Sequence, residues 1–249
     1  MAPSAVGPYS RAMKQPRHGL PSLTLAAAVG LAAVSPGAGL AATPSEFDWS
    51  GKVANGATVE IKNPTGSIFV QHSEDGAVSV RAIRKSESAD PSKAEIKVLH
   101  DGANLVLCTS TPDAAADCSA GPFAAGAKGS SAYQVDELVT VPAGVNVVVR
   151  GIDGQIVIEN APGKVDAQTV NGDIHATLEK VDPTLPMSFR TQNGSIAIEA
   201  PAGAKLVVKA SAPPGNVSSS FPMEGSGTNV ATIDAQTANG TITVKAKQA

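Results

Sequence analysis

Aromatic side chains are scarce in this sequence. One Trp, two Tyr and five Phe make up only 3% of its 249 residues. Aromatic rings usually supply the largest buried surfaces of a globular core. Val, Ile and Ala are instead the main apolar residues, while Gly occurs 24 times and Pro 18 times. A core of small and β-branched side chains favours a thin stack of β-strands over a large globule.

The sequence also lacks the short motifs of common catalytic and cofactor sites. It has no nucleophile elbow, zinc-protease motif, Walker loop or dinucleotide-binding loop. The histidines after residue 42 are His72, His100 and His175, and none has a Ser, Cys or acidic residue at motif spacing. We therefore expect all three on the surface, and we predict no catalytic residue, no cofactor and no metal site.

Long hydrophobic runs are limited to one segment near the N-terminus. Basic residues between Arg11 and Arg17 precede an apolar run from Leu23 to Val34, and small residues follow up to Ala42. This order predicts a secretory signal peptide over residues 1–42. The alternative, a membrane anchor, needs about 20 apolar residues, which is longer than this run. We therefore expect an exported protein, in the periplasm or at the cell surface, without a membrane span after cleavage. We also hypothesise that translation starts at Met13 and not at Met1.

A basic cluster is also missing. Cleavage would remove three of the 19 basic residues and none of the 22 acidic ones, which leaves 16 against 22 and a net charge of −6. An acidic surface repels phosphate backbones and anionic lipid headgroups. The sequence therefore predicts no nucleic-acid partner.

Only two cysteines are present, Cys108 and Cys118. An even number in an exported chain predicts a disulfide, here one that closes a short loop. Closing such a loop stabilises the fold by about 2–3 kcal/mol. Free thiols are an alternative, and a zinc site is a poorer one because no pair of histidines supports it.

What the sequence has in abundance is one repeated unit. Three copies share the pattern Thr-x-Asn-Gly-x-Ile, at residues 169–174, 191–196 and 237–242, and looser copies centre on Gly66, Gly154 and Gly215. Apolar residues alternate on both sides of each central Gly. Such alternation predicts two strands, each with one buried face, joined by a bend at the Gly.

Two all-β architectures satisfy this pattern. In a β-solenoid each copy is one rung, and in a stacked β-hairpin sandwich each Asn-Gly is a type I′ turn. Spacings of 18, 22, 21 and 25 residues between the later glycines suit one rung each and favour a right-handed solenoid-like stack. In both, we expect the turn residues to serve the backbone, because Asn-Gly accepts a positive φ at low cost. These residues are Gly66, Gly154, Asn171, Gly172, Asn193, Gly194, Gly215, Asn239 and Gly240.

The domain organisation follows from the spacing of the copies. We predict a single β-repeat domain over residues 43–249, with an inserted segment at 71–140 and the main repeats at 141–249. Within the insertion we expect an antiparallel cap, with Asp101-Gly102 as a hairpin turn. Its strands should cover residues 77–83, 95–99, 104–108 and 134–141.

Residues 43–50 contain the one Trp, in Phe47-Asp48-Trp49. We expect an edge strand whose aromatic rings close the first apolar layer, and a sugar-stacking platform is the alternative. Acidic residues also recur at the repeats. They could form a calcium site or a sugar-cleaving pair, but capping of turns is the simpler interpretation. They are Asp153, Asp166, Asp173 and Asp234.

The Thr-Val-Asn-Gly-Asp-Ile and Thr-Gln-Asn-Gly-Ser-Ile copies, Phe47-Asp48-Trp49, and the V-P-A-G-V at 141–145 resemble a bacterial family. It is a domain of unknown function named "putative adhesin", made of Asn-Gly β-strand repeats. The resemblance implies a β-solenoid-like fold at the cell envelope, and it supplies no catalytic residue.

The function that we predict is a non-enzymatic envelope protein, an adhesin or scaffold, whose partner is an envelope protein or a surface glycan. The alternatives are a β-helix lyase or hydrolase acting on carbohydrate and an accessory of envelope-stress signalling. Contacts would come from side chains that the alternation turns outward. They are Gln168, Val170, His175, Arg190, Gln192 and Gln236.

Overall fold

The computed structural model describes residues 45–161, 163–223, 225 and 228–247. The predicted signal peptide, residues 1–42, lies outside these ranges. The described residues form 17 β-strands and one short 3-10 turn, η1 (Pro91–Lys93), so the all-β prediction is confirmed. Among them, no helix has the length and apolarity needed to cross a bilayer.

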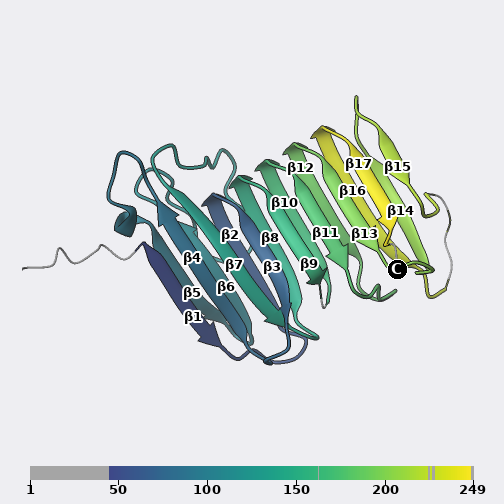
Figure 1. Ribbon diagram of the computed structural model, residues 1–249, viewed down its shortest axis with the longest axis horizontal. Coiled ribbons are helices and arrows are strands. Elements are labelled where there is room, and N and C mark those ends of the chain that lie inside the picture. The colour runs from purple at the N-terminus through teal and green to yellow at the C-terminus, as the bar shows by residue number, and fades with distance from the viewer. Residues whose placement is uncertain (1–44, 162, 224, 226–227, 248–249) are drawn as a thin grey trace, which may run out of the picture. The chain divides into compact units, whose positions relative to one another are not determined.

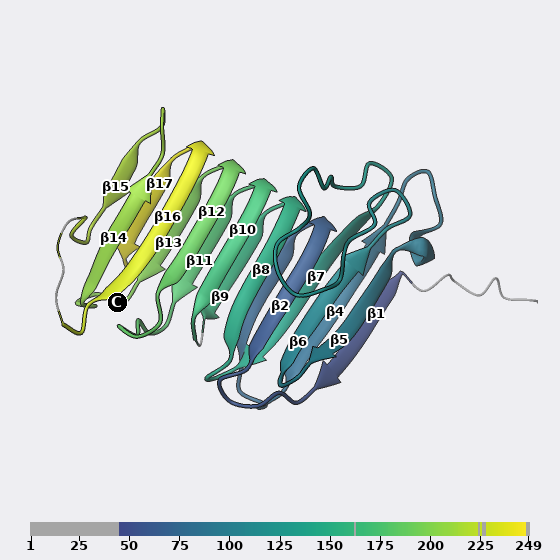
Figure 2. The ribbon, with the colours of Figure 1, turned by 180° about the vertical axis from the view of Figure 1, so that it is seen from behind.

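The strands form two sheets that face one another across an apolar interior (Figures 1 and 2). In spatial order, the nine-stranded sheet contains β1 (Glu46–Gly51), β4 (Val78–Lys85), β7 (Gln134–Pro142), β3 (Ile68–Ser73), β9 (Ile156–Ala161), β11 (Ile174–Leu178), β13 (Ile196–Ala200), β17 (Ile242–Ala246) and β15 (Val217–Ser219). The eight-stranded sheet contains β14 (Leu206–Ser211), β16 (Ala231–Asn239), β12 (Met187–Asn193), β10 (Val165–Asn171), β8 (Asn146–Asp153), β2 (Thr58–Thr65), β6 (Asn104–Ser110) and β5 (Glu95–Asp101).

Each repeat contributes one strand to each sheet, with the bend between them. β10 pairs in parallel with β8 and β12, and β11 pairs in parallel with β9 and β13. Strands from successive repeats therefore lie side by side, as Figure 1 shows. The hairpin sandwich is wrong, because each Asn-Gly passes the chain from one sheet to the other. The arrangement is a solenoid-like stack of rungs, where a rung is one strand of each sheet plus its bend.

The Thr, Asn and Gly of the Thr-x-Asn-Gly pattern each form a hydrogen bond with a neighbouring rung. The buried Thr191 hydroxyl donates to the carbonyl oxygen of Gly172 in the preceding rung at 2.9 Å. The exposed Asn193 amide donates to the side-chain oxygen of Asn171 at 2.8 Å. The Gly172 N–H donates to the Asn193 carbonyl at 2.9 Å. The hydrogen-bond ladders of both sheets thus continue through the bend.

The repeat glycines are required by close approach. A Cβ at Gly172 would meet the carbonyl oxygen of Gly154, and a Cβ at Gly240 that of Gly194, well inside the 3.0 Å that real Cβ atoms keep. Neither glycine has φ in the left-handed region. At these two positions our expectation that Asn-Gly supplies a positive φ is wrong, and the space between rungs decides the residue type.

The rungs do not stack in sequence order at the C-terminal end. β16 and β17 lie between β12/β13 and β14/β15 in their sheets, although β14 and β15 precede them in the chain. The copy in β16–β17 has Thr237 and Asn239, which continue the Thr and Asn ladders at 2.8 Å. The copy centred on Gly215 has Pro-Pro before its Gly and lacks both residues. It therefore occupies the end, where no further rung has to stack on it.

The inserted segment is only partly an antiparallel cap. Its strands lie where the sequence predicts, and β5 and β6 form the expected antiparallel hairpin around Gly102. However, β6 pairs in parallel with β2, and β7 pairs in parallel with β3. The pair β6/β7 is therefore another rung, in which a long segment replaces the bend.

Aromatic side chains close both ends of the apolar interior. β1 is the edge strand of the nine-stranded sheet, and Phe47 and Trp49 pack against the core as expected. The Trp49 ring also lies against Gly51, where a Cβ would collide with it. At the other end, Phe221 is buried in the core beside the last rung. The placement of Phe47 and Trp49 favours capping over sugar stacking for these two residues.

Glu137 is a carboxyl group buried between the two sheets. It is 1% exposed and accepts a hydrogen bond from the Thr109 hydroxyl of the opposite sheet, while its other oxygen has no partner in the described part of the chain. Burial raises the pKa of Glu137 to about 7, and the bond from Thr109 opposes the rise. The carboxyl group is therefore neutral in mildly acidic solution and charged in alkaline solution.

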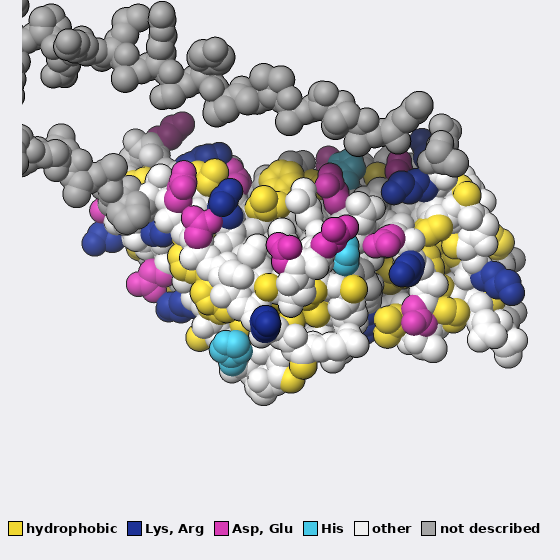
Figure 3. Space-filling model, turned by 60° about the horizontal axis from the view of Figure 1, so that its bottom comes forward, with side chains coloured by type: hydrophobic (Ala, Val, Ile, Leu, Met, Phe, Trp, Pro, Cys, Tyr) yellow, Lys and Arg dark blue, Asp and Glu magenta, His cyan; other side chains and the backbone are white. Residues whose placement is uncertain are grey.

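Figure 3 views the molecule with the bottom of Figure 1 turned forward, and acidic, basic and apolar side chains are scattered among one another there. The part of this face that the view leaves uncovered has no large patch of Lys and Arg. Such mixing gives a weak long-range field.

We predict that Gly172→Ala lowers the free energy of unfolding by about 2–4 kcal/mol, because its Cβ must push two rungs apart. The matched control is Gly203→Ala. Gly203 has φ +80°, and no atom lies within 4 Å of the place that its Cβ would take, so its cost should be only about 1 kcal/mol. Urea denaturation measures both. A larger loss for Gly203→Ala would show that backbone conformation, and not spacing, explains the repeat glycines.

We predict that Glu137→Gln removes a pH-dependent loss of stability. The pKa of Glu137 rises from 4.5 to about 7 on folding, so its contribution is complete below pH 4.5 and is lost as the pH rises through about 7. The difference corresponds to roughly 3 kcal/mol. Urea denaturation should show that the free energy of unfolding of the variant, relative to that of the wild type, is higher at about pH 8.5 than at about pH 5. Glu199→Gln, at an exposed position, is the control, and parallel pH profiles for all three proteins would contradict the prediction.

Candidate functional site

Residues 111–133 connect β6 to β7 and cross the outer face of the eight-stranded sheet; we call them the strap. Figure 2 shows the strap in front of β2 and β8. Cys108 of β6 and Cys118 of the strap form a disulfide with an S–S distance of 1.97 Å, so the predicted bond is present. The strap is therefore tied covalently to the sheet that it covers.

The two ends of the strap meet at Asp113. Its carboxylate accepts hydrogen bonds from the Ser130 hydroxyl at 2.7 Å, from the Thr111 hydroxyl at 2.9 Å and from the N–H of Ala132 at 3.2 Å. These bonds, that from Ser130 most of all, lower the pKa of Asp113 to about 2. The carboxylate is thus charged at any physiological pH and holds the base of the strap closed.

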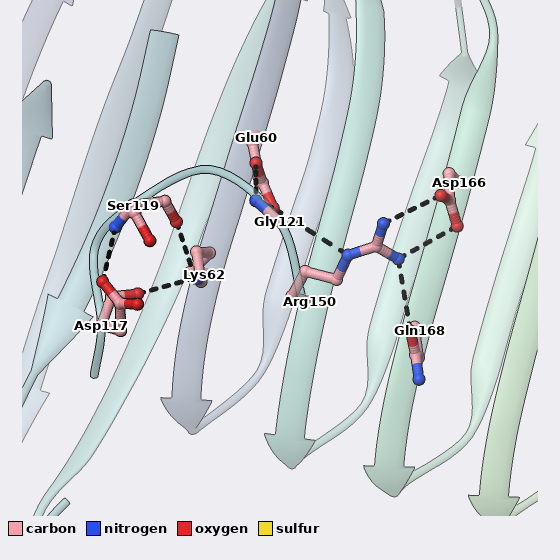
Figure 4. A network of polar contacts seen from close by, with 8 residues as sticks. All are labelled: Glu60, Lys62, Asp117, Ser119, Gly121, Arg150, Asp166 and Gln168. Carbon is pink, nitrogen blue, oxygen red and sulfur yellow. Dashed lines mark hydrogen bonds and ion pairs between the residues drawn. The ribbon is translucent and has the colours of Figure 1, made fainter. Parts of the chain in front are cut away.

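Two charged residues of β2 anchor the middle of the strap (Figure 4). Lys62 is fully buried, and its ammonium group donates to the carbonyl oxygens of Asp117 at 2.6 Å and Ser119 at 2.8 Å. The Glu60 carboxylate accepts the N–H of Gly121 at 2.9 and 3.0 Å. Buried charges are costly unless they are bonded in this way. The charged side chains on the outward face of β2 therefore depend on the strap for their hydrogen bonds.

Arg150 of β8 extends this network toward the repeats. Its guanidinium binds the Asp166 carboxylate through two bonds of 3.0 and 2.9 Å, and its Nε lies 3.9 Å from Glu60. A third bond of 3.4 Å reaches the side-chain oxygen of Gln168. The Arg150 side chain is only 13% exposed. Figure 4 shows the line of contacts that runs from the strap over β2 and β8 to β10.

A groove of about 350 Å³ lies between the strap and the outer face of the eight-stranded sheet. One wall is residues 122–127 of the strap, which are mostly apolar and include Phe123. The floor is the outer face of three strands. It consists of Arg150, Gly151 and Ile152 of β8, Gln168 and Val170 of β10, and Gln192 of β12. The volume falls at the lower end of the range for small-ligand sites.

The polar surface continues beyond the groove. Gln168, Arg190 and Gln236 occupy the same register position on β10, β12 and β16. Arg190 donates to Asp234 at 2.9 Å. The outer face thus presents rows of amide and guanidinium groups that run across the strands.

The six side chains predicted to point outward do not form one surface. Gln168, Val170 and Gln192 line the groove, and Arg190 and Gln236 lie on the same face. His175 is exposed on β11 in the other sheet, because the bend places residues before and after the Gly on different sheets. It cannot act together with the other five.

The three histidines after residue 42 lie on or near the surface, and two of the repeat acids accept hydrogen bonds at the bends. His175 and His100 are exposed as expected, whereas His72 is half-buried and its Nδ1 has no hydrogen-bond partner among the described residues. Asp153 accepts the Asn171 amide at 2.6 Å, and Asp173 accepts the Ser195 N–H at 2.7 Å.

Two of the acids do not cap turns, contrary to expectation. Asp166 and Asp234 lie within strands, where each pairs with an arginine at 2.9 Å. Within the ranges that the structure describes, no group of three His, Cys, Asp or Glu residues could hold a metal ion.

Sequence reasoning missed the residues that hold the strap, Glu60 and Lys62, and two that line the groove, Arg150 and Phe123. The alternation of apolar and polar residues along β2 and β8 marks Glu60, Lys62 and Arg150 as ordinary outward side chains. One signal was present in the pairing of the strands. Lys62 is the register neighbour of Cys108, which also points outward. A disulfide from Cys108 must therefore bring Cys118 and its loop over the Lys62 side chain.

Comparison with known proteins supports the fold. Residues 144–248 match the family model described as Toastrack DUF4097. No curated protein matches the sequence significantly. A crystal structure of a putative cell adhesion protein from Clostridium sporogenes aligns over 81% of this chain and 100% of that chain, with 13% identity and a TM-score of 0.56. A putative adhesin from Bacteroides fragilis aligns over 82% and 98%, with 13% identity and a TM-score of 0.36.

At this identity the first alignment establishes a common fold, and the second is too distant to add to it. The resemblance drawn from the Asn-Gly copies is supported in part: residues 144–248 match a domain of unknown function, and the fold is shared with a protein named a putative cell adhesion protein.

We predict that Lys62→Met loosens the strap and lowers the free energy of unfolding by about 3 kcal/mol, because two strap carbonyls lose a charged donor and Glu60 loses a neighbouring cation. Lys209→Met, at an exposed position of β14 on the same sheet, should change it by less than about 0.5 kcal/mol. Urea denaturation gives the stability, and limited proteolysis reports cleavage within residues 119–128. Equal protease resistance in both variants would contradict the anchoring role.

Proposed function

We propose that this protein is a non-enzymatic, exported binding module of the cell envelope, similar to an adhesin. Its partner is a component of the envelope or the cell surface. It binds in the groove beside the strap and on the adjoining outer face of the eight-stranded sheet. The proposal includes a signal peptide at residues 1–42 and a β-repeat domain at 43–249 that winds as a right-handed solenoid. Within this domain, 71–140 supply the strap and 141–249 the repeated face.

The observation that carries this proposal is the fixed groove beside a regular polar face. Its wall is held by a disulfide and by two buried charged anchors, so little conformational entropy is lost when a ligand enters. Its floor offers exposed amide groups at Gln168, whose oxygen also accepts a bond from Arg150, and at Gln192. A preorganised polar surface of this kind suits recognition.

Two observations weigh against the carbohydrate lyase or hydrolase that the sequence leaves open. Such an enzyme needs an acid and a base that face the same substrate bond. The four repeat acids are instead bonded to Asn171, Ser195 and two arginines. Within the described residues, the groove itself is lined by Arg150, two glutamines and apolar side chains. Binding is therefore the better-supported role.

We expect a photo-crosslinking residue at Gln192 to capture a surface or envelope component in intact producing cells. The matched control is the same residue at His175, which is exposed on the other sheet. Mass spectrometry and glycan staining identify what is captured. Capture at His175 with none at Gln192 would contradict the assignment of the binding face, and no capture at either position would contradict the proposed function.

A further inference from the structure

The groove combines an apolar wall with a polar floor. Phe123, Pro122 and alanines face it from the strap, and Gln168 and Gln192 face it from the sheet. Sugar rings have the complementary character, with apolar C–H faces and a rim of hydroxyl groups. A glutamine amide both donates and accepts hydrogen bonds, as each hydroxyl does. The pairing of these two surfaces in one groove therefore fits a pyranose ring placed edge-down on the sheet.

The guanidinium groups on the floor of the groove and in the row beside it are already paired. Arg150 binds Asp166 and lies 3.9 Å from Glu60, and Arg190 binds Asp234. An acidic polymer would need cations that are free to pair with it. An uncharged ligand leaves these internal pairs intact and is favoured.

The floor repeats in the direction across the strands. Neighbouring strands lie about 4.8 Å apart, and Gln168, Arg190 and Gln236 take equivalent places on three of them. A linear ligand that runs across β10, β12 and β16 meets a hydrogen-bonding side chain at every strand. The small groove volume holds the end of such a chain, and the open face holds the units that follow.

A peptide fits this surface less well. Extended peptides bind most readily to a free sheet edge, where backbone groups are unpaired. Here β8 and β12 flank β10, and β10 and β16 flank β12, so the strands of the floor are hydrogen-bonded on both sides.

We propose that the groove between residues 122–127 and the outer face of β8, β10 and β12 binds the end of an uncharged oligosaccharide, whose following sugars lie along the row of Gln168, Arg190 and Gln236. This inference rests on the proposed function and adds the chemical class of the ligand. Gln168 and Gln192 bind hydroxyl groups, and Phe123 packs against a ring.

The test measures binding of the purified processed protein to an array of neutral oligosaccharides, with sialylated, uronate-containing and sulfated oligosaccharides in parallel. We expect neutral oligosaccharides to bind and their affinity to persist at about 0.5 M salt. The double variant Gln168→Ala/Gln192→Ala should weaken binding by at least roughly tenfold, as should Phe123→Ala. Gln155→Ala, an exposed glutamine beside a bend, is the matched control and should bind like the wild type.

The outcomes separate this inference from the proposed function. Binding of acidic oligosaccharides alone, or neutral binding that the double variant leaves unchanged, would overturn the inference. So would an absence of glycan binding while the crosslinker at Gln192 still captures a protein in cells, and in that case the proposed function stands. An absence of both would overturn the two together. Thermal unfolding of the glutamine variants, whose side chains are exposed, confirms that each remains folded.

Discussion

The approach of one rung to the next at the glycine bend is the constraint on which this structure depends. From Gly66 to Gly240, the carbonyl oxygen of a repeat glycine lies where a Cβ on the glycine of the neighbouring rung would be, so the two backbones can approach only without a side chain there. This contact fixes the register of both sheets at once. Thr hydroxyls inside the bend and Asn amides outside it then bond between rungs. Because the register is fixed, outward side chains from distant repeats line up in rows.

The candidate site arises where the repeat is interrupted. Between β6 and β7 the bend is replaced by the strap. The ladder still continues, because the Glu137 N–H donates to the Ser67 carbonyl oxygen, and the side-chain carboxylate of Asp136 accepts the Ser67 N–H. The stack thus tolerates a long excursion from one rung. The excursion covers Glu60 and Lys62, charged residues that would otherwise face water, and they become its anchors. The regular repeats supply the floor of the groove, and the irregular rung supplies its wall.

The sequence carries the repeated part of this fold and little of the site. Alternation about each Gly predicts the strands, their buried faces and the outward position of Gln168 and Gln192, because these depend on neighbours along the chain. The burial of Lys62 and the pairing of Arg150 with Asp166 depend on where the strap lies, which local patterns do not encode. The position of the last copy could have been read from Thr237 and Asn239, since only that copy continues both ladders.

The place of β16 and β17 has a consequence for how the protein is made. These strands end near residue 246, yet they lie inside the stack, between rungs formed by earlier residues. When the chain is made from its N-terminus, β14 and β15 emerge before β16 and β17, the strands on which they stack. Assembly of this end must wait until β16 and β17 arrive and enter the gap. The solenoid therefore cannot be completed by adding one rung after another, and its last step is an insertion.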